Sequence, residues 1–128
     1  PVAEGVFLVV KPEFGCPTGE AYRKYDESPL EIHDGLERFT AGLPGNYAPE
    51  MYNVFQRLYS DKRIEDICAR LTALGAKGAM LTGSGSAVFG VFDNEANAKR
   101  ASGEFPGCFT AVSGCVREGV SITEREVL

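Results

Sequence analysis

The segment Met80–Phe92, with the sequence MLTGSGSAVFGVF, constrains the fold most strongly. Two apolar runs flank the small residues 83–86, a pattern that is typical of a tight turn between two antiparallel strands. The second run, Ala87–Phe92, is apolar at every position, so we expect a strand that is covered on both faces. Helices can cover one of those faces, and the sequence does not show what covers the other.

The small residues between these strands could also bind phosphate. Backbone N–H groups of successive small residues can converge on an anion, because glycine permits positive φ and a close approach. Ser84 and Ser86 would add hydroxyl donors. The established phosphate-loop patterns do not fit, however, since a dinucleotide fingerprint needs a third glycine where Val88 stands and a helix after the loop. Spacing alone therefore favours an ordinary hairpin turn.

The rest of the chain supplies one strand and four helices before this hairpin, and one helix and one strand after it. The first strand is expected over 6–10, where Lys11-Pro12 ends it. The four helices are expected from Thr18 to about Tyr25, from the capping box Ser28–Glu31 to Gly42, from Pro49 to about Leu58, and from Ser60 or Asp61 to Gly75. After the hairpin, Asp93 is expected to cap a helix that closes at Gly103, and the last strand covers 108–116. This order favours an α+β fold with a mainly antiparallel sheet.

Length and composition exclude several classes of protein. A chain of 128 residues fits one domain, 1–128, and a net charge of -5 is a poor match for nucleic acid. No apolar run approaches the roughly 20 residues of a membrane span, and the first residues do not have the pattern of a signal peptide. With one histidine, His33, no metal-ligand spacing is present. We expect a cytoplasmic protein whose thiols are buried and reduced: Cys16, Cys68, Cys108 and Cys115.

Two further stretches could carry function. In KPEFGCPTGEAY, Lys11–Tyr22, the hydroxyl of Thr18 could face an anionic substrate at a helix N-terminus, although a helix-capping role is favoured. Asn53 and Gln56 lie beside the apolar stripe of their helix. Asn53 could be half-buried and bind a neighbouring loop, and a solvated flank is the simpler account. No Ser/His/Asp triad is present, so we assign no catalytic residue in this chain.

Three stretches in this order resemble one enzyme family. VFLVVKPEFGCPTGEAYRKYD, MYNVFQRL and MLTGSGSAVFGVFDNEANAKRA are similar to the C-terminal half of the 4-diphosphocytidyl-2-C-methyl-D-erythritol kinases, a family within the GHMP kinase superfamily. The resemblance runs from about Val6 to about Val116. A glycine loop before an apolar strand is a feature of the superfamily, whereas the strand-Lys-Pro-loop-Pro-Thr-helix pattern is more specific to this kinase family.

The resemblance implies a fold, a reaction and a set of partners. It implies a ferredoxin-like domain with an antiparallel four-stranded sheet packed with helices. Family members transfer the γ-phosphoryl group of ATP, with Mg²⁺, to the 2-hydroxyl of 4-diphosphocytidyl-2-C-methyl-D-erythritol, in non-mevalonate isoprenoid biosynthesis. Their active site lies in a cleft between an N-terminal and a C-terminal domain, and the N-terminal domain supplies the catalytic residues and the main ATP loop.

The resemblance also assigns residues. The C-terminal glycine loop of the family, beside the phosphate site, maps onto Thr82, Gly83, Ser84, Gly85 and Ser86. The substrate-proximal threonine maps onto Thr18, preceded by Pro17, and an asparagine on the middle helix maps onto Asn53. Some members follow this asparagine with acidic residues, whereas here Val54, Phe55 and Gln56 follow it.

The N-terminal ATP motif of the family, a proline followed by a Gly-Leu-Gly-Ser-Ser-Ala-like run, does not occur in these 128 residues. We therefore expect an isolated C-terminal domain, which agrees with Pro1 at its start, and which is inactive and binds no ATP or Mg²⁺ alone. Its partner would be the N-terminal kinase domain of the same polypeptide. Two alternatives stay open: a domain of another GHMP kinase, of the homoserine or mevalonate type, or a free-standing α+β module that binds a small ligand.

Overall fold

Four strands and six helical segments form the part of the chain described by the structure, a computed structural model that covers residues 3–27, 34–116, 120 and 122. The strands are β1 (Val6–Lys11), β2 (Gly78–Leu81), β3 (Val88–Phe92) and β4 (Phe109–Gly114). The helices are α1 (Thr18–Glu27), α2 (Leu36–Ala41), α3 (Val54–Tyr59), α4 (Lys62–Ala73) and α5 (Glu95–Ser102), with the 3-10 helix η1 (Ala48–Glu50).

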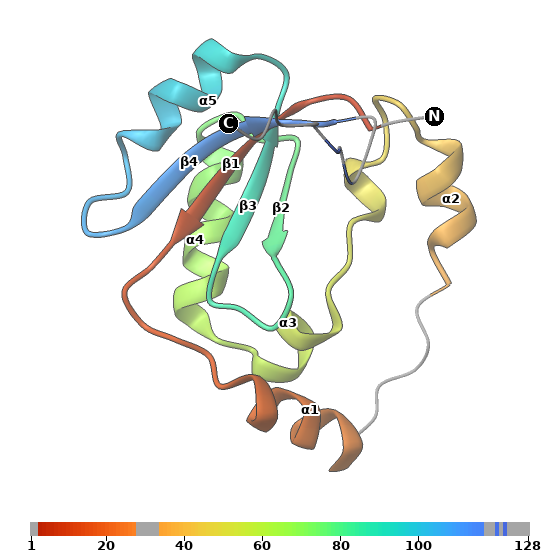
Figure 1. Ribbon diagram of the computed structural model, residues 1–128, viewed down its shortest axis with the longest axis vertical. Coiled ribbons are helices and arrows are strands. Elements are labelled where there is room, and N and C mark those ends of the chain that lie inside the picture. Colours follow the sequence, from red (N-terminus) through yellow and green to blue (C-terminus); the bar gives the residue numbers. More distant parts are fainter. Residues whose placement is uncertain (1–2, 28–33, 117–119, 121, 123–128) are drawn as a thin grey trace, which may run out of the picture.

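The strands form one antiparallel sheet in the order β2-β3-β1-β4 (Figure 1). Val9 of β1 is opposite Phe89 of β3 on one side and Ala111 of β4 on the other. The two central strands are therefore β1 and β3, which carry the most continuous apolar sequences. This arrangement confirms the expected α+β fold with an antiparallel four-stranded sheet.

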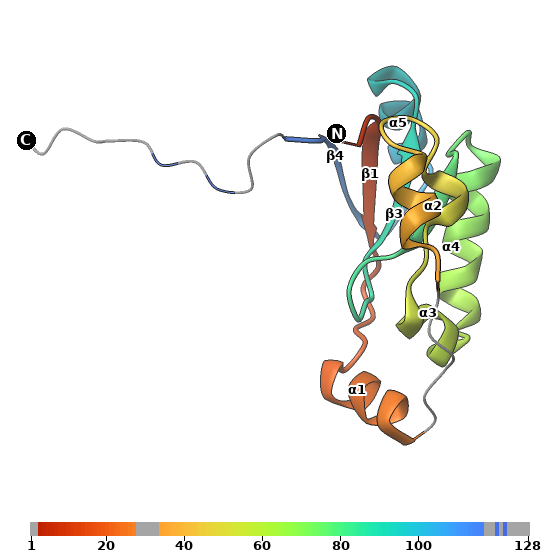
Figure 2. The same ribbon diagram turned by 90° about the vertical axis from the view of Figure 1, so that its right-hand side faces the viewer.

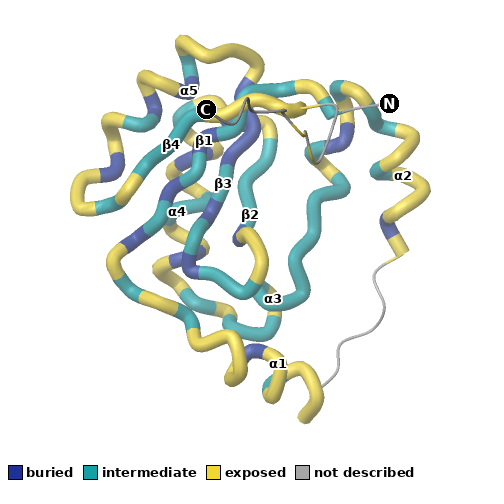
Figure 3. Tube along the Cα trace, in the orientation of Figure 1, coloured by how far each residue is buried: buried dark blue, intermediate teal, exposed yellow. Residues whose placement is uncertain are grey.

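Helices α4 and α5 cover one face of the sheet (Figures 1 and 2). Side chains alternate between the two faces of a strand, and Leu8, Val10, Val88 and Phe92 on the helix-covered face are fully buried. Leu71 of α4 is also fully buried among them. Each such side chain contributes about 1.5–3 kcal/mol to folding. Figure 3 shows this core as the buried stretches of β1, β3 and α4.

The opposite face of the sheet, called here the open face, carries Phe7, Val9 and Phe89. The rings of Phe7 and Phe89 lie 5.9 Å apart between their centroids. A shallow hollow of about 320 Å³ lies on this face, lined by Phe7, Val9, Thr82, Phe89, Ser113 and Gly114. None of the described helices lies over it (Figure 2). On this face of β3, Val91 is fully buried, whereas Phe89 is half-exposed. The expectation that β3 is covered on both faces is therefore right at Val91 and wrong at Phe89.

Helix α4 begins and ends as its sequence predicts. The side chain of Asp61 accepts a hydrogen bond from the backbone N–H of Arg63, at 2.9 Å, and so caps the N-terminus. At the other end Gly75 has a φ of 109°, and the N–H of Ala76 donates to the carbonyl of Leu71, at 3.0 Å. These contacts form a Schellman motif, which requires a residue with positive φ after the helix.

The single helix expected from Pro49 is wrong. The chain instead forms η1, then an extended segment through Asn53, and only then α3. Asn53 has φ -135° and ψ 117°, and its side-chain oxygen accepts from the backbone N–H groups of Phe55 and Gln56. An N-cap residue has non-helical backbone angles, so a helix cannot run through it. Apolar spacing alone did not reveal this break.

Two other expected helix starts need correction. The expected capping box, Ser28–Glu31, and His33 lie outside the described residues. Residues 34–35 are not helical, so the helix expected to run on to Gly42 begins, in the described part of the chain, only at Leu36. Helix α5 is capped by Asn94, whose side chain accepts from the N–H of Asn97 at 2.8 Å, and not by Asp93. Asp93 instead forms an ion pair with Lys77, at 3.0 Å.

All four cysteines are free thiols, but they are not all buried. Cys115 is exposed and the other three are half-buried, so the expectation of four buried thiols is wrong for Cys115. Within the described ranges, no group of three His, Cys, Asp or Glu residues could hold a metal ion. No helix in that part of the chain combines the length and the apolar character that crossing a membrane requires.

Candidate functional site

The glycine loop, Thr82–Ser86, forms the tip of the hairpin between β2 and β3 (Figure 1). The N–H of Thr82 donates to the carbonyl of Ala87 at 2.9 Å, and the N–H of Gly85 donates to the carbonyl of Thr82 at 3.2 Å. Gly83 and Gly85 have φ values of 57° and 91°, in the left-handed region that glycine adopts without strain. The loop is therefore the tight hairpin turn that its spacing predicts.

Gly85 is also needed for close packing. A Cβ atom at this position would lie 3.0 Å from Cδ1 of Leu81 and 3.1 Å from Sγ of Cys16. At Gly83, in contrast, a Cβ atom would meet nothing within 4 Å. The loop therefore packs tightly against the Pro12–Pro17 segment on its Gly85 side and is open on its Gly83 side.

Asn53 and Gln56 hold the β2 side of the glycine loop. The side-chain nitrogen of Asn53 donates to the carbonyls of Leu81 at 2.8 Å and Gly83 at 2.9 Å. The side-chain oxygen of Gln56 accepts from the N–H of Leu81 at 2.8 Å. The solvated-flank interpretation of Asn53 is wrong, and the alternative of a half-buried residue bound to a neighbouring loop is right. The sequence contains a signal for a helix that starts at Asn53, because an asparagine three residues before a glutamine is typical of a helix start.

Thr18 lies against the glycine loop from the other side. Its hydroxyl is 3.0 Å from the hydroxyl of Ser84, although the two residues are 66 positions apart. The expected capping role is wrong, because Thr18 is the first residue of α1 and the carbonyl of Pro17 accepts from the N–H of Ala21 at 3.1 Å. The Pro17 carbonyl also accepts from the hydroxyl of Tyr59, at 3.4 Å. The segments that carry Pro17, Thr18, Asn53 and the glycine loop therefore converge.

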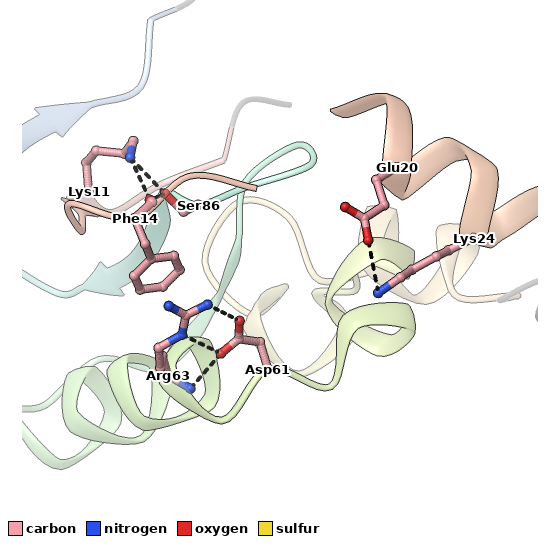
Figure 4. A network of polar contacts seen from close by, with 7 residues as sticks. All are labelled: Lys11, Phe14, Glu20, Lys24, Asp61, Arg63 and Ser86. Carbon is pink, nitrogen blue, oxygen red and sulfur yellow. Dashed lines mark hydrogen bonds and ion pairs between the residues drawn. The ribbon is translucent and has the colours of Figure 1, made fainter. Parts of the chain in front are cut away.

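Sequence reasoning missed a fourth element of this site, which we call the Lys11 cluster: Lys11, Pro12, Phe14 and Ser86. The ammonium of Lys11 donates to the hydroxyl of Ser86 at 2.8 Å and to the carbonyl of Phe14 at 3.2 Å (Figure 4). It also donates to the carbonyl of Pro12 at 2.8 Å. The Ser86 hydroxyl donates in turn to the Phe14 carbonyl. No local pattern could reveal this cluster, because Lys11 and Ser86 are 75 positions apart.

The ring of Phe14 is fixed by the start of α4. The guanidinium of Arg63 lies 3.7 Å from the centroid of this ring (Figure 4). Asp61 orients the guanidinium through two contacts, at 3.1 Å to Nε and 2.8 Å to an η nitrogen. The side-chain hydrogen bond from Arg63 lowers the pKa of the Asp61 carboxyl, so the pair stays charged at neutral pH. Phe14 is therefore held by its ring from α4 and by its carbonyl from Lys11.

Together these contacts present hydroxyl and backbone groups of two segments at one end of the sheet. Thr18 is exposed and Ser84 is half-exposed, so a ligand could reach both hydroxyls. Phosphoryl transfer additionally requires charges that hold the phosphates and a group that orients the nucleophile. In the described ranges, Thr18 and Ser84 are hydrogen-bonded to each other and not to a carboxylate or imidazole base. This arrangement can position a substrate, and it does not form a complete catalytic set.

Comparison with known proteins gives the family. Residues 32–110 match the family model described as GHMP kinases C terminal. The 4-diphosphocytidyl-2-C-methyl-D-erythritol kinase of Clostridium novyi (strain NT) is 34% identical, over 74% of this chain and 36% of that relative. The kinase of the same name from Caldanaerobacter subterraneus subsp. tengcongensis is 32% identical, over 90% of this chain and 43% of that relative. The chain thus spans well under half the length of these curated relatives.

Solved structures agree on the fold. A crystal structure of 4-(cytidine 5'-diphospho)-2C-methyl-D-erythritol kinase matches with a TM-score of 0.69 and 20% identity, over 90% of this chain and 45% of that chain. Homoserine kinase from Cytophaga hutchinsonii matches with a TM-score of 0.57 and 16% identity, over 91% and 43% of the two chains. The family model covers more than half of the sequence, and these two structures share its fold. The chain belongs to the GHMP kinase family and corresponds to the C-terminal domain of its members.

Proposed function

We propose that this chain is the C-terminal domain of an ATP-dependent kinase that phosphorylates the 2-hydroxyl of 4-diphosphocytidyl-2-C-methyl-D-erythritol. The names of its curated relatives support the reaction. The observation that carries the proposal is the convergence of Thr18 and Asn53 on the glycine loop, since Thr18 contacts Ser84 and Asn53 binds Gly83. This contact between segments that are distant in the sequence supports the proposal that they line one site.

In this proposal the glycine loop lines the phosphate site, and Pro17 and Thr18 lie toward the methylerythritol end of the substrate. Catalysis of phosphoryl transfer is mostly positioning and electrostatic stabilisation, so fixed hydroxyl and N–H groups are useful on this wall of the site. ATP, with Mg²⁺, would be held mainly by the N-terminal domain, and the metal would neutralise charge on the phosphates. The free thiols agree with a cytoplasmic enzyme.

In this proposal the N-terminal domain packs against the open face. The hollow on this face is lined by the apolar side chains of Phe7, Val9 and Phe89, and it reaches the glycine loop at Thr82. A domain that packs there would bring its own groups next to the loop. The relatives are long enough to supply such a domain, because this chain matches only 36–43% of their length. Apolar surface of this kind is typical of an interaction site.

The decisive experiment measures phosphorylation of the cytidyl substrate by the complete polypeptide that carries this chain. Gly83→Val and Gly85→Val are expected to lower kcat/KM by tenfold or more. Both glycines have positive φ, which valine disfavours, so either substitution should distort the loop. Gly107→Val is the control: Gly107 also has positive φ, at 78°, and lies outside the loop. Full activity of both loop variants would contradict the role given to the loop.

Substrate comparison separates the alternatives. Homoserine and mevalonate are assayed beside the cytidyl substrate, and preference for either one would place the enzyme with another GHMP kinase. An open reading frame that starts just before Pro1 would favour a free-standing binding module instead. The 128-residue chain alone is expected to bind ATP weakly or not at all, and tight ATP binding in calorimetry would show that the nucleotide site is misplaced.

A further inference from the structure

The ammonium of Lys11 has three hydrogens and three acceptors, and each acceptor lies in a loop outside the helices and strands. Two are the carbonyls of Pro12 and Phe14, and the third is the hydroxyl of Ser86 in the glycine loop. Lys11 is half-buried, Ser86 is 1% exposed, and the ion pairs found among the described residues do not include Lys11. Among the described residues, Lys11 is therefore a cation whose hydrogen-bond acceptors are all neutral oxygens.

A partly buried ammonium is costly unless hydrogen bonds replace its hydration. The three oxygens do so here, and Ser86 passes the polarisation on by donating to the Phe14 carbonyl. Lys11 could bind a phosphate only by giving up one of these acceptors. Because all three of its donors are used by Pro12, Phe14 and Ser86, the geometry of Lys11 suits a structural role and not ligand binding.

We propose that Lys11 is a positioning residue, which fixes the glycine loop to the Pro12–Pro17 segment and thereby sets the distance between Thr18 and Ser84. Ser86 follows the tightly packed Gly85, and Phe14 lies four positions before Thr18. The Lys11 cluster therefore joins the two segments whose hydroxyls meet at 3.0 Å. This inference rests on the proposed function for its catalytic meaning, but the structural link can be tested without any assay of activity.

The structural link is tested by hydrogen exchange in the 128-residue chain. Lys11→Met keeps an unbranched apolar side chain and removes the charge and the three donors. We expect at least tenfold faster exchange of amides in residues 82–87 and 13–18, with no change in α5. Lys62→Met is the matched control, because Lys62 is exposed and pairs only with Asp66 in its own helix. Unchanged exchange in both segments would overturn the proposal. If Lys11→Met does not fold, Ser86→Ala breaks the same link at a smaller side chain.

The catalytic meaning is tested by kinetics of the complete polypeptide. Lys11→Met and Ser86→Ala are each expected to lower kcat by about tenfold with little change in the KM for ATP, and Lys11→Arg to recover part of the loss. The double variant should be no worse than Lys11→Met alone, because both substitutions break one chain of hydrogen bonds. A large rise in the KM for ATP with Lys11→Met only, or multiplied losses in the double variant, would overturn the positioning role. If the wild-type polypeptide phosphorylates none of the substrates, the proposed function fails, and hydrogen exchange alone decides on the link.

Discussion

At the scale of single residues, Gly83 and Gly85 differ in what surrounds them, and this difference predicts different costs of substitution. Gly83→Ala is expected to lower the free energy of unfolding by about 1 kcal/mol, the penalty of a left-handed backbone for a residue with a Cβ. Gly85→Ala should cost about 2–4 kcal/mol, since the new Cβ also meets Leu81 and Cys16 at 3.0–3.1 Å. Urea unfolding of both variants measures the difference. Equal costs would mean that Gly85 is required only for its φ.

Asn53 gives a second prediction at this scale, because it acts both as a cap and as a donor. Asn53→Asp keeps the oxygen that caps α3 and loses the donor to the carbonyls of Leu81 and Gly83. We expect it to lower the free energy of unfolding by about 2 kcal/mol, since two acceptors lose their partner. Asn94→Ala, which removes a cap only, should cost about 1 kcal/mol. If Asn53→Asp is as stable as the wild type in urea unfolding, its contacts with the loop contribute nothing.

Cys68 gives a prediction on pH. Burial raises the pKa of its thiol to about 11 from an ordinary value of 9.0, against a smaller lowering by the hydrogen bond from Gln56. The folded state therefore keeps a proton that the unfolded chain releases between pH 9 and about 11, so stability falls as the pH rises through this window. At pH 8 only about one Cys68 in a thousand is a thiolate. Iodoacetamide at pH 8 should label exposed Cys115 long before Cys68, as read by mass spectrometry of peptides, and equal rates would contradict the shift.

The candidate residues could be predicted one by one, but their contacts could not. Thr18, Asn53 and the glycine loop stand out through a local pattern or a resemblance of segments. The bond between Thr18 and Ser84, in contrast, joins positions 66 residues apart, and that between Lys11 and Ser86 joins positions 75 apart. A lysine before a proline at a strand end has no local signature of a structural cation. Long-range pairing is fixed by the topology of the sheet, which brings the end of β1 beside the tip of the β2-β3 hairpin.

At the scale of elements, boundaries were predictable where side chains mark both ends. Helix α4 has Asp61 before it and Gly75 after it, and both act as expected. The η1-α3 region has one continuous apolar stripe, which hides the break at Asn53. Periodicity reports which face is apolar, whereas the break depends on a side chain that binds the loop after β2.

The packing of α4 on the sheet depends on Gly90 in β3. A Cβ at this position would lie 3.2 Å from Leu71 Cδ2 and 3.2 Å from Ala76 Cβ. Gly90→Ala is therefore expected to push α4 away from the sheet and to lower the free energy of unfolding by about 1–3 kcal/mol. Gly114→Ala in edge strand β4 is the control, because a Cβ there would meet nothing within 4 Å. A Gly90→Ala variant that matches Gly114→Ala in urea unfolding would show that α4 approaches β3 less closely.

At the scale of the whole molecule, the sheet has one face closed by α4 and α5 and one face with an apolar hollow that ends at the glycine loop. If the N-terminal domain packs on the open face, this chain should bind the preceding part of the complete polypeptide when the two parts are expressed separately. Phe89→Glu should weaken this binding about 30-fold or more, the effect of losing a central apolar contact worth about 2 kcal/mol.

The control for this prediction is Leu36→Glu, which places the same carboxylate on another exposed apolar side chain, in α2 and away from the hollow. It should leave the affinity unchanged in calorimetry. Circular dichroism must first show that Phe89→Glu is folded, and Val9→Gln tests the same hollow if it is not. A folded Phe89→Glu chain that binds as tightly as the wild type would place the partner elsewhere. The apolar residues of β1 and β3 on this face would then serve the stability of the sheet alone, and the glycine loop would meet its phosphate from another side.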